Sequence, residues 1–221
     1  MKKFTVITIT ILMSLTSIYS ANAHAGVDTR GVTPIKGTSS VILLRIGHGC
    51  TAPDGVTKVG THSVSVVIPS DLLAAPASAA MQIPGFNAVV VPSSTLDAAG
   101  KPVSSTITWS AKSELFDVNP IGFAEFGIRG SWATAGKFWL DTTQICRLAT
   151  VTPVAARIKS VMDPKSKTKI KVWVPATSKV TYQELKLAWV THDSSAPSVM
   201  STDMTTETGP SPTVTVAAPV A

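Results

Sequence analysis

A histidine at position 24 follows directly on a segment typical of the cleavage site of an export signal. Ala21-Asn22-Ala23 fits the small-residue requirement of a secretory peptidase. Cleavage after Ala23 would make His24 the first residue of the exported chain. Its free α-amine, which titrates near ~8, and its imidazole, near ~6.5, could then close a chelate ring on a metal ion. Two nitrogen donors of this kind suit Cu(II) best among the common divalent ions, so we expect Cu(II) at the mature N-terminus.

Two further residues are candidate metal ligands. His48 lies in Gly47-His48-Gly49-Cys50 and is interpreted either as a second nitrogen ligand or as a polar cap on a turn made by the two glycines. Asp28 could supply an oxygen ligand, or it could simply start a turn before Gly31. His62 opens a predicted strand, and we expect it at the surface or at a sheet edge.

The first 23 residues have the pattern of a signal peptide. Lys2 and Lys3 give a basic start, and the segment from Phe4 to Tyr19 carries no charge. We therefore expect a periplasmic, secreted or cell-surface protein of 198 residues, the number left when 23 are removed from 221. After the signal, no apolar run is long enough to predict a transmembrane segment.

Composition narrows the classes of partner. The full chain has 19 basic and 13 acidic residues, and loss of Lys2 and Lys3 leaves 17 and 13. This mild excess predicts no nucleic-acid groove. The densest basic cluster lies between Lys159 and Lys171. It is predicted to be a solvated loop and strand edge, with contact to an anionic lipid or polymer as the alternative.

The two cysteines, Cys50 and Cys146, predict one disulfide, because an exported chain meets an oxidising compartment. The alternative, a thiolate metal site, lacks the Cys-x-x-Cys spacing that such sites use. No Gly-x-Ser-x-Gly, His-Glu-x-x-His or phosphate-binding glycine loop is present. We therefore expect a protein that is not an enzyme.

The elements that must position these residues are predicted to be short strands separated by Gly, Pro and Asp. The predicted strands are Ser40–Ile46, His62–Pro69, Ala88–Val91, Ser104–Trp109, Ile121–Gly130, Lys137–Asp141, Lys169–Val174 and Val180–Val190. The last of these could also be a helix, since Leu185 and Trp189 are four residues apart. Such even spacing favours an antiparallel β-sandwich over residues 24–193. Residues 194–221, rich in Ser, Thr and Pro, are predicted to be a disordered tail.

The order of several short motifs resembles the YcnI-like copper-binding family over roughly His24 to Arg147. The motifs that carry the resemblance are His24, Arg45-Ile46-Gly47-His48-Gly49-Cys50, Val67-Ile68-Pro69, Ile107-Thr108-Trp109, Phe123-Ala124-Glu125-Phe126-Gly127-Ile128 and Gln144-Ile145-Cys146. The resemblance implies an Ig-like or cupredoxin-like β-sandwich. It also implies copper handling outside the cytoplasm, with Cu(II) held by the amine and imidazole of the N-terminal histidine, a carboxylate and a tryptophan.

This sequence departs from the family pattern at three places. The family usually continues His-Val-Thr, whereas His24 is followed by Ala25-Gly26-Val27. The stretch that matches the family carboxylate, Gly37-Thr38-Ser39-Ser40, has neither Glu nor Asp. The tryptophan expected shortly after Cys146 is also missing. Only His24 therefore carries over as a ligand.

These observations predict an exported copper-binding protein in copper trafficking, buffering or homeostasis. Its expected partners are the copper ion and, as a further candidate, another exported or membrane copper protein. Two alternatives stay open. One is a surface binding module without a metal, because β-sandwiches host many such roles. The other is a copper-dependent oxidative enzyme, which would need a second histidine such as His48, His62 or His192.

Overall fold

Strands form where β-branched and apolar residues alternate with polar ones. The structure, a computed structural model, describes residues 25–76 and 79–220. Its strands are, in chain order, β1 (Gly26–Asp28), β2 (Ser39–Ile46), β3 (Cys50–Thr51), β4 (Lys58–Val59), β5 (Thr61–Pro69), β6 (Phe86–Pro92), β7 (Ser104–Ala111), β8 (Ala124–Ser131), β9 (Gly136–Trp139), β10 (Thr142–Val154), β11 (Arg157–Met162), β12 (Lys169–Val174), β13 (Thr177–Thr191), β14 (Val199–Met200), β15 (Thr206–Pro210) and β16 (Thr213–Val216). A short 3₁₀ helix, η2 (Glu114–Phe116), precedes β8. The predicted all-β class is confirmed. The predicted signal peptide lies outside the described residues.

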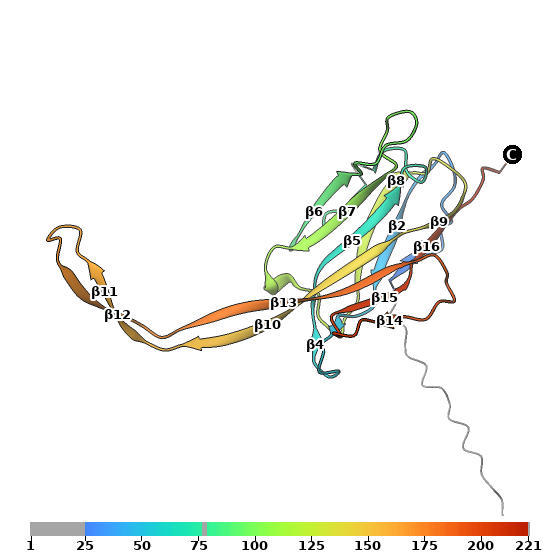
Figure 1. The fold of residues 1–221 in the computed structure, drawn as a ribbon. Coiled ribbons are helices and arrows are strands. Elements are labelled where there is room, and N and C mark those ends of the chain that lie inside the picture. Colours follow the sequence, from blue (N-terminus) through green and yellow to red (C-terminus); the bar gives the residue numbers. More distant parts are fainter. Residues whose placement is uncertain (1–24, 77–78, 221) are drawn as a thin grey trace, which may run out of the picture.

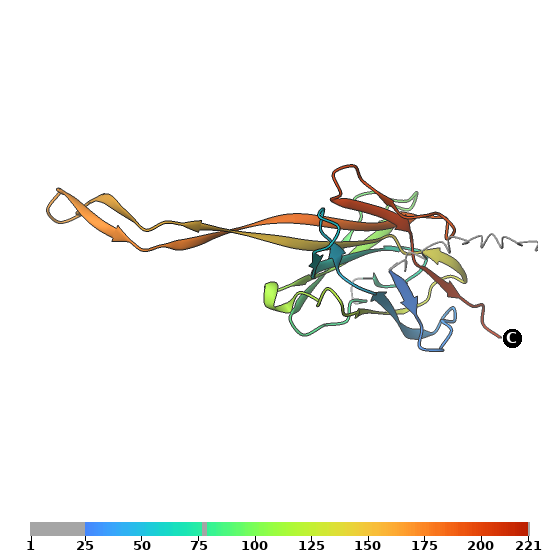
Figure 2. The same ribbon diagram turned by 90° about the horizontal axis from the view of Figure 1, so that it is seen from below.

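Two sheets form the layers of a β-sandwich (Figures 1 and 2). One has the order β1-β2-β8, and the other has the order β14-β15-β13-β10-β5-β7-β6. Neighbouring strands in both sheets are antiparallel, except that β15 runs parallel to β13. No helix in the described ranges is both long enough and apolar enough to cross a membrane.

The core lies between the two sheets and follows from strand alternation. In β5, Val64, Val66 and Ile68 are fully buried, as their alternation with serine predicts. The opposite sheet contributes Phe126 of β8. Its ring lies 5.4 Å from that of Trp109 on β7, so the two layers meet through an aromatic contact.

The predicted strands are all present, with shifted ends. The helix considered for Val180–Val190 is wrong, because these residues lie within β13 and pair with β10. The prediction omitted β1, β3, β4, β10 and β11. The outer half of β10 and all of β11 are exposed, and the buried positions in the inner half of β10 include polar Thr142 and Gln144, so neither strand shows a clear apolar alternation.

The predicted disordered tail is wrong. Between residues 194 and 220 the chain forms β14, β15 and β16, and β15 adds to the large sheet beside β13. Strand β16 pairs with β9 and buries Val214 and Val216. The composition suggested disorder, but β-branched Thr and Val in alternation favour a strand once one face can be buried.

The predicted disulfide joins Cys50 and Cys146 and is confirmed. Cys50 begins β3, shortly after β2 has left the small sheet, and Cys146 lies in β10 of the large sheet. Both cysteines are buried. The bond therefore holds the segment after β2 against the large sheet.

A two-stranded ribbon leaves the sandwich, and we call residues 149–183 the β-arm (Figures 1 and 2). Its inner part is the continuation of β10 and β13, and its outer part is the hairpin β11–β12. The pair Val154–Thr177 and the pair Arg157–Val174 belong to the same register, so the β-arm is one hairpin with a short break. None of its residues is buried.

Reduction of the disulfide should lower stability, because the cross-link joins residues 96 positions apart. In the chain-entropy model a loop of this length contributes roughly 4–5 kcal/mol. We expect the free energy of unfolding, measured by urea denaturation, to fall by this amount when a reductant is added, with a lower midpoint. A double variant, C50A/C146A, should show one midpoint with or without reductant. An unchanged midpoint in the unmodified protein would contradict the expectation.

Removal of the C-terminal strands should destabilise the sandwich. A chain that ends at Ser198 lacks β14–β16, including Val214 and Val216, and a buried valine contributes about 1.5–3 kcal/mol. We expect its free energy of unfolding to fall by at least about 3 kcal/mol, measured by circular dichroism during denaturation. A chain that ends at Ala217 keeps all three strands and should unfold like the full chain. Equal midpoints for the two shortened chains would show that these strands add no stability.

Candidate functional site

The start of β1 lies beside the end of β2. The two strands pair antiparallel, with Gly26 opposite Arg45, so Ala25 lies at the end of β2 where Gly47 and His48 follow. Ala25 is 4% exposed and belongs to the core cluster. The next position, His24, lies outside the described residues, and its role as a ligand stays a prediction. The described chain therefore brings the attachment point of His24 to the His48 end of the small sheet.

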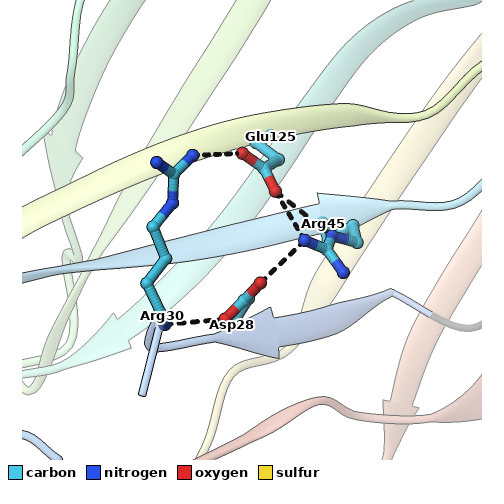
Figure 3. Close-up of polar contacts among 4 residues, drawn as sticks. All are labelled: Asp28, Arg30, Arg45 and Glu125. Atoms are coloured by element: carbon cyan, nitrogen blue, oxygen red, sulfur yellow. Dashed lines mark hydrogen bonds and ion pairs between the residues drawn. The ribbon is translucent and has the colours of Figure 1, made fainter. Parts of the chain in front are cut away.

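Four charged side chains form a closed network across β1, β2 and β8 (Figure 3). Arg45 donates from Nη2 to Asp28 Oδ2 and to Glu125 Oε1, both at 2.7 Å. Arg30 donates from Nη2 to Glu125 Oε2 at 2.8 Å. The backbone N–H of Arg30 donates to Asp28 Oδ1 at 2.7 Å. Glu125 thus pairs with two arginines.

This network holds its charges in their ionised forms. Hydrogen bonds from Arg45, and then from Arg30, lower the pKa of Glu125 below its ordinary value of 4.5. The same bond to Glu125 raises the pKa of Arg45. The guanidinium of Arg45 also lies 5.5 Å from the centre of the Phe123 ring, which favours the cation further.

Asp28 starts a turn, which is one of the two roles considered for it, and it also forms an ion pair with Arg45. It precedes a turn in which the N–H of Val32 donates to the carbonyl of Thr29, and Arg30 and Gly31 have positive φ angles of 50° and 76°. Both of its carboxylate oxygens accept hydrogen bonds. A metal ion would have to displace Arg45 or the Arg30 amide to use this carboxylate.

The segment that carries His48 is fixed by its neighbours. Buried Gln144 donates from Nε2 to the carbonyl of His48 at 2.8 Å and to Thr61 Oγ1 at 2.6 Å. The N–H of Gly49 donates to the carbonyl of Pro120 at 2.9 Å. A Cβ atom on Gly49 would lie 2.0 Å from the carbonyl oxygen of Val59, so only glycine fits there. The backbone of His48 is therefore rigid.

The ring of His48 is half-buried, and its Nδ1 contacts the carbonyl oxygen of Gly49. That contact favours the tautomer in which Nδ1 carries the proton and Nε2 has the lone pair a metal needs. In the described part of the chain, no hydrogen bond to His48 Nε2 is found. The ring can thus act as a nitrogen ligand without losing an ion pair.

The other two candidate histidines are paired with carboxylates. His62 Nδ1 lies 2.8 Å from Asp117 Oδ1, and His62 is 8% exposed, so the predicted surface position is wrong. It is buried because β5 lies between β7 and β10 rather than at an edge. His192 Nε2 lies 2.7 Å from Asp141 Oδ1, and its ring stacks on Trp139 at 5.3 Å.

The described residues contain no group of three or more His, Cys, Asp or Glu side chains that could hold a metal. Ser40 lies in the stretch where the sequence resemblance would place a carboxylate, and its hydroxyl accepts a hydrogen bond from Trp132 Nε1 at 2.7 Å. Among the described histidines, His48 is thus the one without a carboxylate partner, and it lies near the start of β1.

Sequence reasoning missed Arg30 and Arg45 as members of this site. Arg45 is the one charged residue of β2 and follows four apolar residues, and a charge in that position indicates a partner on a neighbouring strand. Its partner, Glu125, stands directly opposite in β8. The site could have been found only by pairing the motif that contains Arg45 with the motif that contains Glu125. The sequence alone does not specify that these two strands become neighbours.

Comparison with known proteins gives a structural likeness alone. No family model matches the chain, and no curated protein matches it. Among solved structures, the chain is similar to a Nocardia farcinica protein whose crystal structure is described as that of an uncharacterized protein with an immunoglobulin-like fold. The two are 18% identical with a TM-score of 0.46, and the match covers 88% of this chain and 99% of the other. At this identity and TM-score, the match assigns neither a family nor an activity.

The network around Glu125 should make stability depend on pH. Because its pKa is lowered on folding, Glu125 stabilises the fold above its ordinary value of 4.5, and this contribution is lost as pH falls through the lower folded value. We expect Glu125→Gln to destabilise the protein at pH 7, with a difference that shrinks below pH 4.5. Urea denaturation at a series of pH values measures this. Glu184→Gln, at a longer 3.7 Å ion pair with Arg147, should show little change. If the free energy of unfolding depends on pH in the same way for Glu125→Gln and Glu184→Gln, the network does not make Glu125 a source of pH-dependent stability.

Proposed function

We propose that this protein is an exported Cu(II)-binding protein that acts in copper trafficking, buffering or homeostasis, with the metal held at His24. The observation that carries the proposal is the position of His24 directly after a predicted cleavage site. Removal of residues 1–23 would create an amine and an imidazole on one residue. Cu(II) favours this pair of nitrogen donors.

The described residues next to His24 support the proposal. Ala25, the residue that follows His24 in the sequence, is buried and belongs to the core cluster. His48 follows the end of β2, and its rigid backbone suits a third ligand, as does its Nε2, which has no hydrogen-bond partner among the described residues. Asp28 suits this role less well, because a metal would compete with Arg45 for its oxygen.

The chemistry of the donors sets the conditions of binding. Both nitrogens of His24 must be deprotonated to bind a metal, so copper binding releases protons and weakens as pH falls. Bound copper would supply a Lewis-acidic, redox-active ion. The residues described here supply a fixed anchor, a nitrogen donor, and a charged network that holds β1 against β2 and β8.

A Cu(II) titration followed by electron paramagnetic resonance tests the proposal. The exported protein that begins at His24 should bind one copper ion and show at least two nitrogen donors. A form that keeps Ala23 has no free amine on His24, and we expect its affinity to fall at least about tenfold, since loss of even an indirect partner of a ligand costs that much. His24→Ala should behave in the same way.

The variant His48→Ala tests the third ligand independently of the chelate formed by the amine and imidazole of His24. We expect it to remove one nitrogen donor from the spectrum while one copper ion still binds. His192→Ala is the matched control, since His192 pairs with Asp141, and it should leave the spectrum unchanged. If Cu(II) affinity is the same in the cleaved form and the form that keeps Ala23, the N-terminal site is excluded. A binding module without metal would then be the better hypothesis.

A further inference from the structure

The β-arm extends away from the sandwich (Figures 1 and 2). Its inner part contacts η2 through the hydrogen bond from Tyr182 to Glu114, whereas the outer hairpin is exposed on both faces. In the outer hairpin, every residue of β11 is exposed, and so is every residue of β12 except half-buried Val174. The break between inner and outer parts contains Pro175, which cannot donate to the ladder. A two-stranded ribbon without a packed face is marginally stable in water, so this surface is suited to contact with something outside the chain.

The β-arm also carries the charge of the molecule. Residues 149–183 contain seven Lys and Arg and one acidic residue, Asp163. The exported chain has 17 basic and 13 acidic residues, so 10 basic and 12 acidic residues lie outside the β-arm. The β-arm thus carries a net charge of +6, and the rest of the exported chain carries −2. A partner of this surface should be strongly anionic.

One face of the outer hairpin combines this charge with large apolar side chains. Ile158 pairs with Trp173, and Met162 pairs with Lys169, so these four residues lie on one face together with Lys171. Trp173 is 65% exposed, Ile158 64% and Met162 53%. We call these five residues the Trp173 face. Exposed apolar groups of this size, next to lysines, are typical of an interaction site.

We infer that the Trp173 face binds the surface of an anionic phospholipid bilayer. Tryptophan prefers the interface between water and hydrocarbon, and lysine stems can extend their charges towards phosphate headgroups while their carbons stay in apolar surroundings. Ile158 and Met162 would enter the upper acyl region beside Trp173. The turn after Met162 carries Lys165 and Lys167, so the hairpin lies along the bilayer surface instead of inserting its tip.

The aliphatic side chains distinguish this partner from other polyanions. A nucleic acid or an anionic polysaccharide would use the lysines and could stack on Trp173, but Ile158 and Met162 would gain little from such hydrated partners. A second copy of this chain fits poorly, because two β-arms repel each other and the rest of the exported chain has a net charge of only −2. The inference is independent of copper, because no residue of the Trp173 face belongs to the N-terminal site.

Sedimentation with vesicles tests the inference. The exported protein beginning at His24 should bind phosphatidylcholine vesicles that contain a third of phosphatidylglycerol, and it should stay in solution with phosphatidylcholine alone. Lys169→Glu with Lys171→Glu should weaken binding about tenfold or more, because basic residues near an anionic surface each contribute to the affinity. Lys101→Glu with Lys112→Glu gives the same net charge on exposed positions of the sandwich, and binding should fall far less.

A second variant distinguishes insertion of apolar side chains into the bilayer from electrostatic attraction of the lysines to its surface. Ile158→Ser with Trp173→Ser keeps all lysines, and we expect it to lose most of the binding that survives at 0.5 M salt, where surface attraction is screened. Both changes are on exposed residues, so the fold should persist. The inference is overturned if the protein does not bind anionic vesicles, or if both lysine pairs weaken binding equally. Binding to DNA or to polyglutamate in preference to vesicles would also overturn it and would assign the β-arm to that partner.

Discussion

The contact between the rings of Trp109 and Phe126 joins the two layers on which the rest of the molecule depends. Trp109 belongs to the large sheet and Phe126 to the small one, and Phe86 adds an edge contact to Phe126 at 5.7 Å. The indole N–H of Trp109 donates to the carbonyl of Met81, so burial of the ring leaves no polar atom without a partner. With the layers fixed in this way, β1, β2 and β8 are held together, the charged network lies across them, and His48 follows the end of β2.

The disulfide and Gln144 fix the segment of residues 47–50, which follows β2. Residues 47–50 lie outside both sheets, and glycine at two of these positions makes the segment flexible in an unfolded chain. In the fold, the disulfide holds this segment at Cys50, and the hydrogen bond from Gln144 holds it at the carbonyl of His48. A half-buried histidine on such a support loses little entropy when it binds a ligand.

The sequence predicted most of the sandwich because its core strands have one buried face, which alternation reveals. Strand β5 and the disulfide are clear examples. It failed for β16, where Thr and Val alternate within a segment whose overall composition resembles a linker. It also failed for the outer part of β10, which pairs along its length but buries nothing, so no apolar pattern marks it. The site was predicted in part, because pairing of Arg45 with Glu125 depends on which strands become neighbours.

The constant register of the β-arm makes its length independent of the sandwich. From Thr142 opposite Trp189 to Met162 opposite Lys169, each step outward on one strand matches one step on the other. Loss or gain of the same number of residues in both strands leaves every pairing nearer the sandwich unchanged, and an even number also keeps the outer side chains on the same faces. The distance of the outer hairpin from the sandwich can therefore change in evolution while the core, β1 and the charged network keep their contacts.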